Sequence, residues 1–543
     1  MRTQNLEIPQ GKRKPLYRFL EIVPGAVSYG AIILLFLLSW LDPVIGSIYL
    51  FALIASTLVK AIAVAYRTVQ GYKVIKRASH VDWAKRLADL EHPHASYERL
   101  RDDNNTSYHF DRHLENLKMM AAMDTEYPQP SQVYHIVIMT AYDESIEVLD
   151  PSIAAVQNTD FPNTRIIFVL AYEQRGGEIM AATAKQLAAK YQGVFKDFLL
   201  IQHPADLPNE VIGKGPNLTY AGHAVAKYVK TQKLPIENIV VTSLDSDNRM
   251  APKYLDSVAY EFITHPNRQR LSYQPVSLFM NNIWDAPAPS RIVALSNSFF
   301  NVITTMRPHA LRNFASHSQP LQALEAMNFW SKRTIVEDGH QYWRSLFFFH
   351  GDYSVVPIRI PIYQDAVMDE TLWKTIKAQF IQVRRWYYGA SDVAYVGTRL
   401  FTTKKNRIMP FWQLFPKFWR LLDGHVTLAI LAPIVAFGGW VPMIMNLSSH
   451  EMVAYNIPSI VGIVETFASI GLLVSILVSF KVLPKRPAKY RRGRNLLMII
   501  QWILMPVASI LYQSIAAFYS QTRLMLGKYM EKFDVTKKIV KNN

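Results

Sequence analysis

Long apolar segments flank a polar central block of the chain. Five of them are candidates for membrane spans: residues 22–41, 43–59, 426–447, 457–480 and 495–522. Only the fourth contains a charged residue, Glu465. Because a helix needs about 20 apolar residues to cross a bilayer core, the pattern predicts an integral multi-pass membrane protein. Two spans would precede the central block and about three would follow it.

The central block has a different pattern, in which short apolar runs alternate with helical stretches. Runs of strand length lie at 135–140, 165–170, 197–201 and 238–242. A helical pattern covers 178–191 between the second and the third of them. Strands that alternate with helices favour an α/β fold with a parallel, Rossmann-like sheet, whose ligands bind at the carboxyl ends of the strands.

These patterns divide the chain into six predicted parts. They are an N-terminal cytosolic segment with two transmembrane helices (1–66), a charged helical lead-in (67–130), the α/β domain (131–407), an interfacial amphipathic helix (408–424), about three transmembrane segments (425–520) and a basic tail (521–543). The interfacial helix is predicted from aromatic residues at helical spacing with Lys417 and Arg420 among them. A buried helix of the soluble domain is the alternative.

The formal net charge of +17 reflects membrane topology rather than nucleic-acid binding. Basic residues gather before the first span and at 481–494, whereas the loop 448–456 has no Lys or Arg. The positive-inside rule then places the N-terminus and the α/β domain in the cytosol, as in a bacterial-type plasma membrane, with anionic membrane lipids as partners. The basic tail also favours the cytosol, although five spans would place it outside. The absence of cysteine excludes disulfides and thiolate chemistry.

Two acidic clusters could carry chemistry. Asp245 and Asp247 follow a strand of buried type, and two such carboxylates can hold a hard divalent cation that bridges phosphates. Glu337 and Asp338 follow a short apolar run, where a partly desolvated carboxylate can take a proton from a hydroxyl group. The structural alternatives are a solvated turn for the first pair and a helix cap for the second.

Two further segments could bind a diphosphate. Gln382 and Arg385 share one face of a predicted helix at 372–388, where Arg385 can neutralise a leaving diphosphate and Trp386 can offer a flat surface to a sugar ring. Lys214 lies in a Gly-Lys-Gly turn that lacks the P-loop spacing, which argues against an ordinary phosphate-loop kinase. The structural alternatives are a helix that rests on the membrane surface for the segment with Gln382 and Arg385, and a flexible surface turn for the segment with Lys214.

In this order, the clusters resemble glycosyltransferase family 2, in its membrane branch with cellulose synthase, hyaluronan synthase and ceramide glucosyltransferase. That branch carries Asp-x-Asp, an acidic pair and Gln-x-x-Arg-Trp, which correspond here to 245–247, 337–338 and 382–386. The resemblance implies a GT-A fold and an inverting, metal-dependent transfer with Mg²⁺ or Mn²⁺. The donor would be a nucleotide sugar, usually a UDP-sugar. The acceptor would be a lipid or a glycan, as in polysaccharide synthesis.

The resemblance also assigns roles to single residues. Thr140, Tyr142 and Glu144 would border the nucleotide, and Lys214 and Asp245 would lie near the donor. Asp245 and Asp247 would hold the metal, and Asp338 with Glu337 would supply the base. Gln382, Arg385 and Trp386 would bind the diphosphate and the acceptor. Glu173 stands where the family commonly has an acidic pair, and this departure leaves the donor sugar open. A transporter or flippase and a non-catalytic anion-binding membrane protein are the competing functions.

Overall fold

An eight-stranded mixed sheet forms the centre of the α/β domain. Its order is β3-β2-β1-β4-β7-β6-β8-β5. The strands are β1 (Tyr134–Ala141), β2 (Ile166–Glu173), β3 (Asp197–His203), β4 (Ile239–Asp245), β5 (Arg249–Met250), β6 (Leu271–Phe279), β7 (His317–Pro320) and β8 (Ser354–Gln364). The four predicted strands are confirmed as β1 to β4, and they pair in parallel. Antiparallel pairing of β7 with β4 makes the sheet mixed rather than wholly parallel.

The computed structural model describes residues 6–123, 127–447, 452, 456–463, 466, 476–478, 480–481 and 483–534. Half of the predicted span at 457–480, including Glu465, and the last part of the basic tail lie outside the described residues. The helices of the α/β domain and its lead-in are α3 (Trp83–Asp89), α4 (Pro93–Leu100), α5 (Phe110–Ala122), α6 (Ile146–Gln157), α7 (Gly177–Lys190), α8 (Lys214–Thr231), α9 (Tyr254–Thr264), α10 (Ala288–Thr305), α11 (Leu321–Ala326), α12 (Glu337–Phe348), α13 (Leu372–Tyr387) and α14 (Asp392–Leu400).

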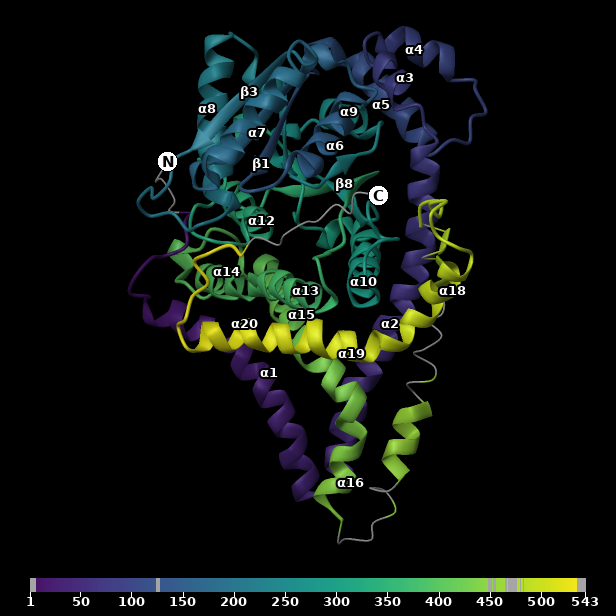
Figure 1. Cartoon of the computed structure of the whole chain (residues 1–543), viewed down its shortest axis with the longest axis vertical. Helices are drawn as coiled ribbons and strands as arrows, with labels where there is room; N and C mark the ends of the chain where they lie inside the picture. Colours follow the sequence, from purple (N-terminus) through teal and green to yellow (C-terminus); the bar gives the residue numbers. More distant parts are fainter. Residues whose placement is uncertain are drawn as a thin grey trace.

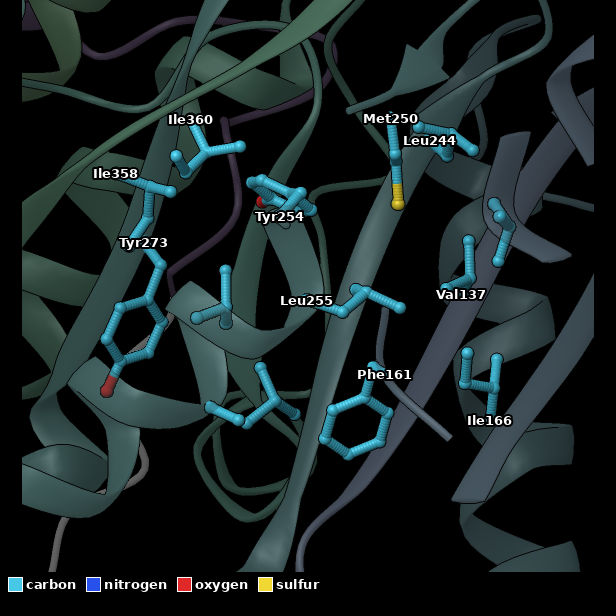
Figure 2. Close-up of a cluster of buried hydrophobic side chains, with 14 of the residues drawn as sticks. Val137, Phe161, Ile166, Leu244, Met250, Tyr254, Leu255, Tyr273, Ile358 and Ile360 are labelled. Carbon is cyan, nitrogen blue, oxygen red and sulfur yellow. The ribbon is translucent and has the colours of Figure 1, made fainter. Parts of the chain in front are cut away.

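Alternate residues of β1 face two different hydrophobic layers. Val137 packs in the layer formed with α6 and α9, whereas Ile136 packs in the layer formed with α8 and α11. Figure 2 shows Val137, Phe161 and Leu255 in the first of these layers. Helices on both faces explain why the strands read as continuous apolar runs, because neither face of such a sheet meets water.

The register of the sheet brings two of the predicted motifs to one edge. Thr140 of β1 lies directly beside Asp245 of β4. Both residues stand near the carboxyl ends of parallel strands, where a crevice forms in α/β sheets. The motif positions therefore follow from strand pairing.

Long apolar helices extend from the lower end of this body in the view of Figure 1. They are α1 (Pro15–Leu41), α2 (Pro43–Ser79), α15 (Phe411–Phe437) and the short α16 (Val441–Met445). Among the described residues, α1 and the segment from α15 to α16 are long and apolar enough to cross a membrane, and α2 has a shorter apolar part at Pro43–Ala55. Two boundaries differ from the prediction. Helix α2 continues past residue 66, and 408–424 is no separate interfacial helix because α15 runs through it.

The last apolar segment takes a different course from the other long helices. It comprises α18 (Gly493–Ile500), α19 (Met505–Ser509), the π-helical turn η12 (Ile510–Ile515) and α20 (Ala516–Met525). Its length and composition would allow a span, but it runs crosswise to α1 and α15 at the base of the α/β body (Figure 1). It packs against α13 and α10 on one side and against α1 and α15 on the other. This course explains how the C-terminal tail can share a side with the α/β domain.

Cysteine labelling can test this arrangement, because the natural chain contains no cysteine. Lys528→Cys, just after α20, should react with a membrane-impermeant maleimide from the same side as Lys227→Cys in the α/β domain. Leu447→Cys, at the far end of the helices, should react only from the opposite side. All three positions are exposed. Labelling of Lys528→Cys and Leu447→Cys from one common side would contradict the crosswise course of the last segment.

Candidate functional site

A single cavity of about 1060 Å³ opens at the carboxyl edge of the sheet. It extends from β1 and β4 to α15 and η12, next to the apolar helices. Every residue that the sequence analysis singled out for the site lines it: Thr140, Tyr142, Glu144, Glu173, Lys214, Asp245, Asp247, Glu337, Asp338, Gln382, Arg385 and Trp386. Folding therefore brings together residues that lie up to 246 positions apart (386 − 140).

Lys214 begins α8 and lies at the centre of the acidic residues. Its Nζ is 2.6 Å from Oδ1 of Asp245, and its side chain is only 9% exposed. Burial favours the neutral amine, but the carboxylates of Asp245 and Asp338 outweigh burial and raise the pKa of Lys214. The cation is thus held charged in the interior, as expected where desolvation is offset by opposite charges.

Glycine is required beside this lysine because of a close approach between two backbones. A Cβ on Gly215 would overlap the carbonyl oxygen of Ser331 and lie 3.1 Å from Cβ of Glu337. One turn further, Asn217 donates a 3.0 Å hydrogen bond from Nδ2 to the carbonyl of Ala171 on β2. The start of α8 is therefore fixed to both the sheet and the segment before α12. The Gly-Lys-Gly turn is the start of a helix rather than a flexible surface turn.

The predicted nucleotide end is organised by Glu144. Its carboxylate accepts a 2.7 Å hydrogen bond from the backbone N–H of Tyr142 and a 3.0 Å bond from the hydroxyl of Ser246. Glu173 forms an ion pair with Arg175, whose guanidinium lies 5.4 Å from the centre of the Tyr142 ring. The loops after β1, β2 and β4 are thereby linked to one another.

Three residues without an assigned role position the Asp245–Asp247 turn. The side-chain amide of Asn281 donates to the carbonyl of Asp247 at 3.0 Å. The hydroxyl of Ser316 accepts a 3.2 Å bond from the backbone N–H of Asp245, and the backbone N–H of Asp365 donates to Oδ2 of Asp247 at 3.2 Å. Sequence analysis could assign these residues no role, because polar residues in loops carry no periodic signal.

Glu337 and Asp338 form the first turn of α12, so they also occupy the cap position that the alternative interpretation predicted. Burial and the neighbouring Asp338 carboxylate raise the pKa of Glu337 well above its ordinary value. Burial would also raise the pKa of Asp338, but Lys214 and a hydrogen bond from Glu337 outweigh it and lower that pKa. Oδ2 of Asp338 accepts a further 2.9 Å bond from the backbone N–H of Ala315. Within this pair the pKa of Glu337 is therefore raised and that of Asp338 is lowered, which favours the proton on Glu337 and the charge on Asp338.

The predicted helix at 372–388 is confirmed as α13 (Leu372–Tyr387). Oε1 of Gln382 accepts a 3.0 Å hydrogen bond from Gln379. The guanidinium of Arg385 lies 3.5 Å from the centre of the Phe533 ring, and the Trp386 ring lies 6.1 Å from that of Phe279.

The C-terminal segment also reaches the cavity, which sequence analysis did not predict. The backbone N–H of Phe533 donates to the carbonyl of Ile212 at 2.7 Å, and Ile212 donates back to Glu531 at 3.1 Å. Asp534 forms an ion pair with Arg384 of α13. A short strand-like pairing thus fixes the segment just before Lys214. It also places the tail beside the α/β domain.

Comparison with known proteins shows the family. The family model described as glycosyl transferase family group 2 matches residues 240–520, more than half of the chain. The chain belongs to this family. It is therefore a glycosyltransferase that uses a nucleotide sugar.

Other comparisons of this glycosyltransferase give weaker likenesses. No curated protein matches it. Among solved structures it is similar to the mannosyltransferase PcManGT from Pyrobaculum calidifontis in complex with GDP-Man and Mn²⁺, at 12% identity and a TM-score of 0.39, covering 78% of this chain and 98% of that one. It is also similar to S. aureus TarS 1–349 in complex with UDP-GlcNAc, at 12% identity and a TM-score of 0.30, covering 60% and 92%. At these TM-scores the likeness carries no argument.

The carboxylates of the glycosyltransferase offer only part of a metal site. Within the described parts of the chain, no group of three or more His, Cys, Asp or Glu side chains is placed to hold an ion. Asp245 and Asp247 provide oxygen atoms, which Mg²⁺ and Mn²⁺ prefer. Two protein carboxylates suit a cation whose remaining ligands come from phosphate and water, as is usual for Mg²⁺ at phosphate sites.

A substitution at Gly215 tests the close approach at the start of α8. Gly215→Ala should lower the stability of the protein by about 1–3 kcal/mol, since overpacking a tight site displaces its neighbours. Thermal unfolding of the detergent-solubilised protein would measure this loss. Gly193→Ala is not a matched control because Gly193 has a φ of +74°. Gly493→Ala is better matched because its Cβ meets nothing within 4 Å. Equal unfolding temperatures for both variants would contradict the close packing.

Proposed function

We propose that this protein is a membrane-embedded, inverting glycosyltransferase that moves a sugar from a nucleoside diphosphate to a lipid or glycan acceptor. One observation carries the proposal. One cavity contains the Asp245–Asp247 turn, the cations of Lys214 and Arg385, and Asp338, whose pKa is lowered by Lys214. Such a set can hold a diphosphate leaving group and accept a proton, which are the two tasks of direct sugar transfer.

The donor would lie along the carboxyl edge of the sheet. Thr140, Tyr142 and Glu144 would border the nucleoside, and Glu173 would border the donor at the end of β2. Lys214 and Arg385 both line the adjoining part of the cavity. Their positive charges would stabilise the charge that develops on the departing diphosphate. A uridine nucleotide is the proposed donor type, as in most of the membrane branch that the motifs resemble.

A divalent cation, Mg²⁺ or Mn²⁺, fits the Asp245–Asp247 turn. The fit rests on the all-oxygen donor set and on the fixed orientation of Asp247, which accepts a backbone hydrogen bond from Asp365. When bound, the cation would neutralise part of the diphosphate charge. Asp245 already pairs with Lys214, so Asp247 is the better candidate for a direct ligand.

Asp338 is the proposed general base. Lys214 and a hydrogen bond from Glu337 lower its pKa against the effect of burial, which favours the ionised carboxylate. It can therefore accept the proton of an acceptor hydroxyl as that oxygen attacks the anomeric carbon. Attack on the face opposite the leaving diphosphate inverts the configuration at that carbon.

The acceptor would approach from the membrane side. The cavity is continuous from Asp338 to α15 and η12, and Gln382 and Trp386 of α13 line its middle part. The α/β domain would lie in the cytosol of a bacterial-type cell, because the basic clusters flank its side of the membrane. Product length distinguishes a processive polysaccharide synthase from an enzyme that adds a single sugar.

Asp338→Asn tests this function. Protein in lipid nanodiscs would be screened with a panel of nucleotide sugars and Mn²⁺, and released nucleoside diphosphate and product length would be measured. Loss of a general base should lower turnover by about 10²–10⁴-fold, while nucleotide-sugar binding stays within a factor of a few. Asp352→Asn, on an exposed side chain, serves as the control. Full turnover by Asp338→Asn would exclude the proposed base.

The pH dependence of turnover tests the role of Lys214. Because its charge lowers the pKa of Asp338, Lys214→Gln should raise that pKa. Turnover requires the ionised carboxylate and is lost as the pH falls through this pKa, so the acidic limb of the profile should move to higher pH. The measurement is the pH profile of kcat at saturating donor. Lys227→Gln, exposed on the same helix, should leave the limb in place, and an unshifted limb in Lys214→Gln would contradict the coupling.

A further inference from the structure

A group of basic side chains lines the cavity near α15, and none of them belongs to the predicted donor motifs. The group consists of Arg307, Arg312, Lys417 and Arg420. In the part of the chain that the structure describes, none of the four forms an ion pair. The acidic residues that line the same end are Asp392, which pairs with His340 at 2.6 Å, and Asp423. Positive charge is therefore in excess at this end.

The position of Arg312 distinguishes this group from ordinary positive-inside residues. Such residues flank a transmembrane helix and extend into water or toward lipid head groups. Arg312 instead belongs to the loop before β7 in the α/β domain, where it is half-buried and its guanidinium lies 5.7 Å from the centre of the Trp343 ring. Burial lowers the pKa of Arg312, the nearby carboxylate of Asp392 opposes this effect, and Arg420 adds to it. Because Asp392 already pairs with His340, the excess of positive charge here is costly unless an anion joins it.

The same loop connects the cationic end to the proposed base. Arg312 precedes Ala315 by three residues, and the backbone N–H of Ala315 donates to Asp338. At no more than about 3.6 Å per residue, the two backbones lie within about 11 Å of each other. The side-chain amide of Gln274 holds the intervening Phe314 through bonds of 3.1 and 3.0 Å to its backbone N–H and carbonyl. Arg312 is thus presented on a fixed loop.

Apolar side chains lie beside the cations. Phe300, Phe314 and Leu421 line the cavity there, and the rings of Phe300 and Phe314 are 6.1 Å apart. Phe300 is 55% exposed despite its size. An end that combines an excess of positive charge with exposed aromatic surface, next to a membrane-length helix, suits a molecule that is anionic at its head and apolar behind it.

We propose that this end of the cavity binds the phosphate-bearing head group of a membrane lipid, with Arg312 and Arg420 as its principal contacts. The lipid chain would leave along Phe300 and α15 toward the bilayer. A hydroxyl of such a head group would lie within reach of Asp338 and could serve as the acceptor. That last step rests on the proposed function, whereas binding of the lipid does not.

Lipid retention tests the site directly. Detergent-purified protein would be incubated with dioleoylphosphatidic acid or with dioleoylphosphatidylcholine, and bound lipid would be counted by native mass spectrometry. The wild-type protein should retain phosphatidic acid in preference to phosphatidylcholine. Arg312→Gln and Arg420→Gln should each weaken this retention by about tenfold or more, the scale of one lost charged hydrogen bond. Arg312→Lys, which keeps the charge, should restore part of it.

The controls separate the possible sources of binding. Lys405→Gln removes an exposed cation just before α15 that does not line the cavity, and it should leave retention unchanged. Equal retention by Arg312→Gln, Arg420→Gln and wild type would overturn the proposal. Displacement of the lipid by inorganic phosphate at matched concentration would reassign the site to free phosphate, and equal binding of phosphatidylcholine would exclude a role for the charge.

A failure of the lipid site can be told apart from a failure of the proposed function. Asp338→Asn should abolish transfer and still retain phosphatidic acid as the wild type does. Arg420→Gln, an exposed position, should lose phosphatidic acid and still bind the nucleotide sugar. Loss of nucleotide-sugar binding in Arg420→Gln would show that the cations act on the donor, which would also overturn the lipid assignment.

Discussion

The buried ammonium group of Lys214 determines the charge state of the whole site. Several carboxylates gathered in a partly dry cavity would normally take up protons, because burial penalises their charged forms. Lys214 sits 2.6 Å from Asp245 and lowers the pKa of Asp338. Burial and the Asp338 carboxylate raise the pKa of Glu337 instead. One cation thus separates the roles of two adjacent carboxyl groups that are chemically similar.

This arrangement depends on where α8 begins. Gly215 allows the first turn of α8 to touch the backbone of Ser331, and Asn217 ties that turn to β2. Lys214 is therefore placed by a helix that rests on the sheet and not by a mobile loop. The same precision extends to Asp247, which accepts a backbone hydrogen bond from Asp365, while Asn281 holds its carbonyl. Rigid placement of charged groups is what makes them effective when charge develops on a substrate.

The membrane part is joined to the site through packing rather than through a linker. The segment from α18 to α20 lies crosswise beneath the α/β body and contacts α13, which carries Arg385 (Figure 1). The chain that follows α20 pairs with Ile212 and stacks Phe533 on Arg385. Helix α15 contributes Lys417 and Arg420 to the opposite end of the same cavity. The cavity consequently has one end at the sheet and another at the bilayer.

The sequence by itself determined the parts of this protein whose signals are local. Apolar runs identified β1 to β4, and membrane-length segments identified α1 and α15, because burial in a sheet or in lipid demands continuous apolar residues. The order of short motifs identified the chemistry, and all of these motifs line one cavity. The ion pair between Lys214 and Asp245 could not be predicted from the sequence, since the two residues are 31 positions apart and meet only because the start of α8 packs against the sheet.

Tertiary structure alone decided features that depend on contacts between distant segments. The apolar length of residues 493–525 is compatible with a span, and only packing against α13 and α10 turns that segment along the base of the domain. The opposite pKa shifts of Glu337 and Asp338 likewise depend on burial and on a cation from another helix. The cationic end of the cavity joins residues of a domain loop and a membrane helix about 100 positions apart. Local periodicity contains no information about such contacts between distant segments, because these contacts depend on how whole helices and strands pack together.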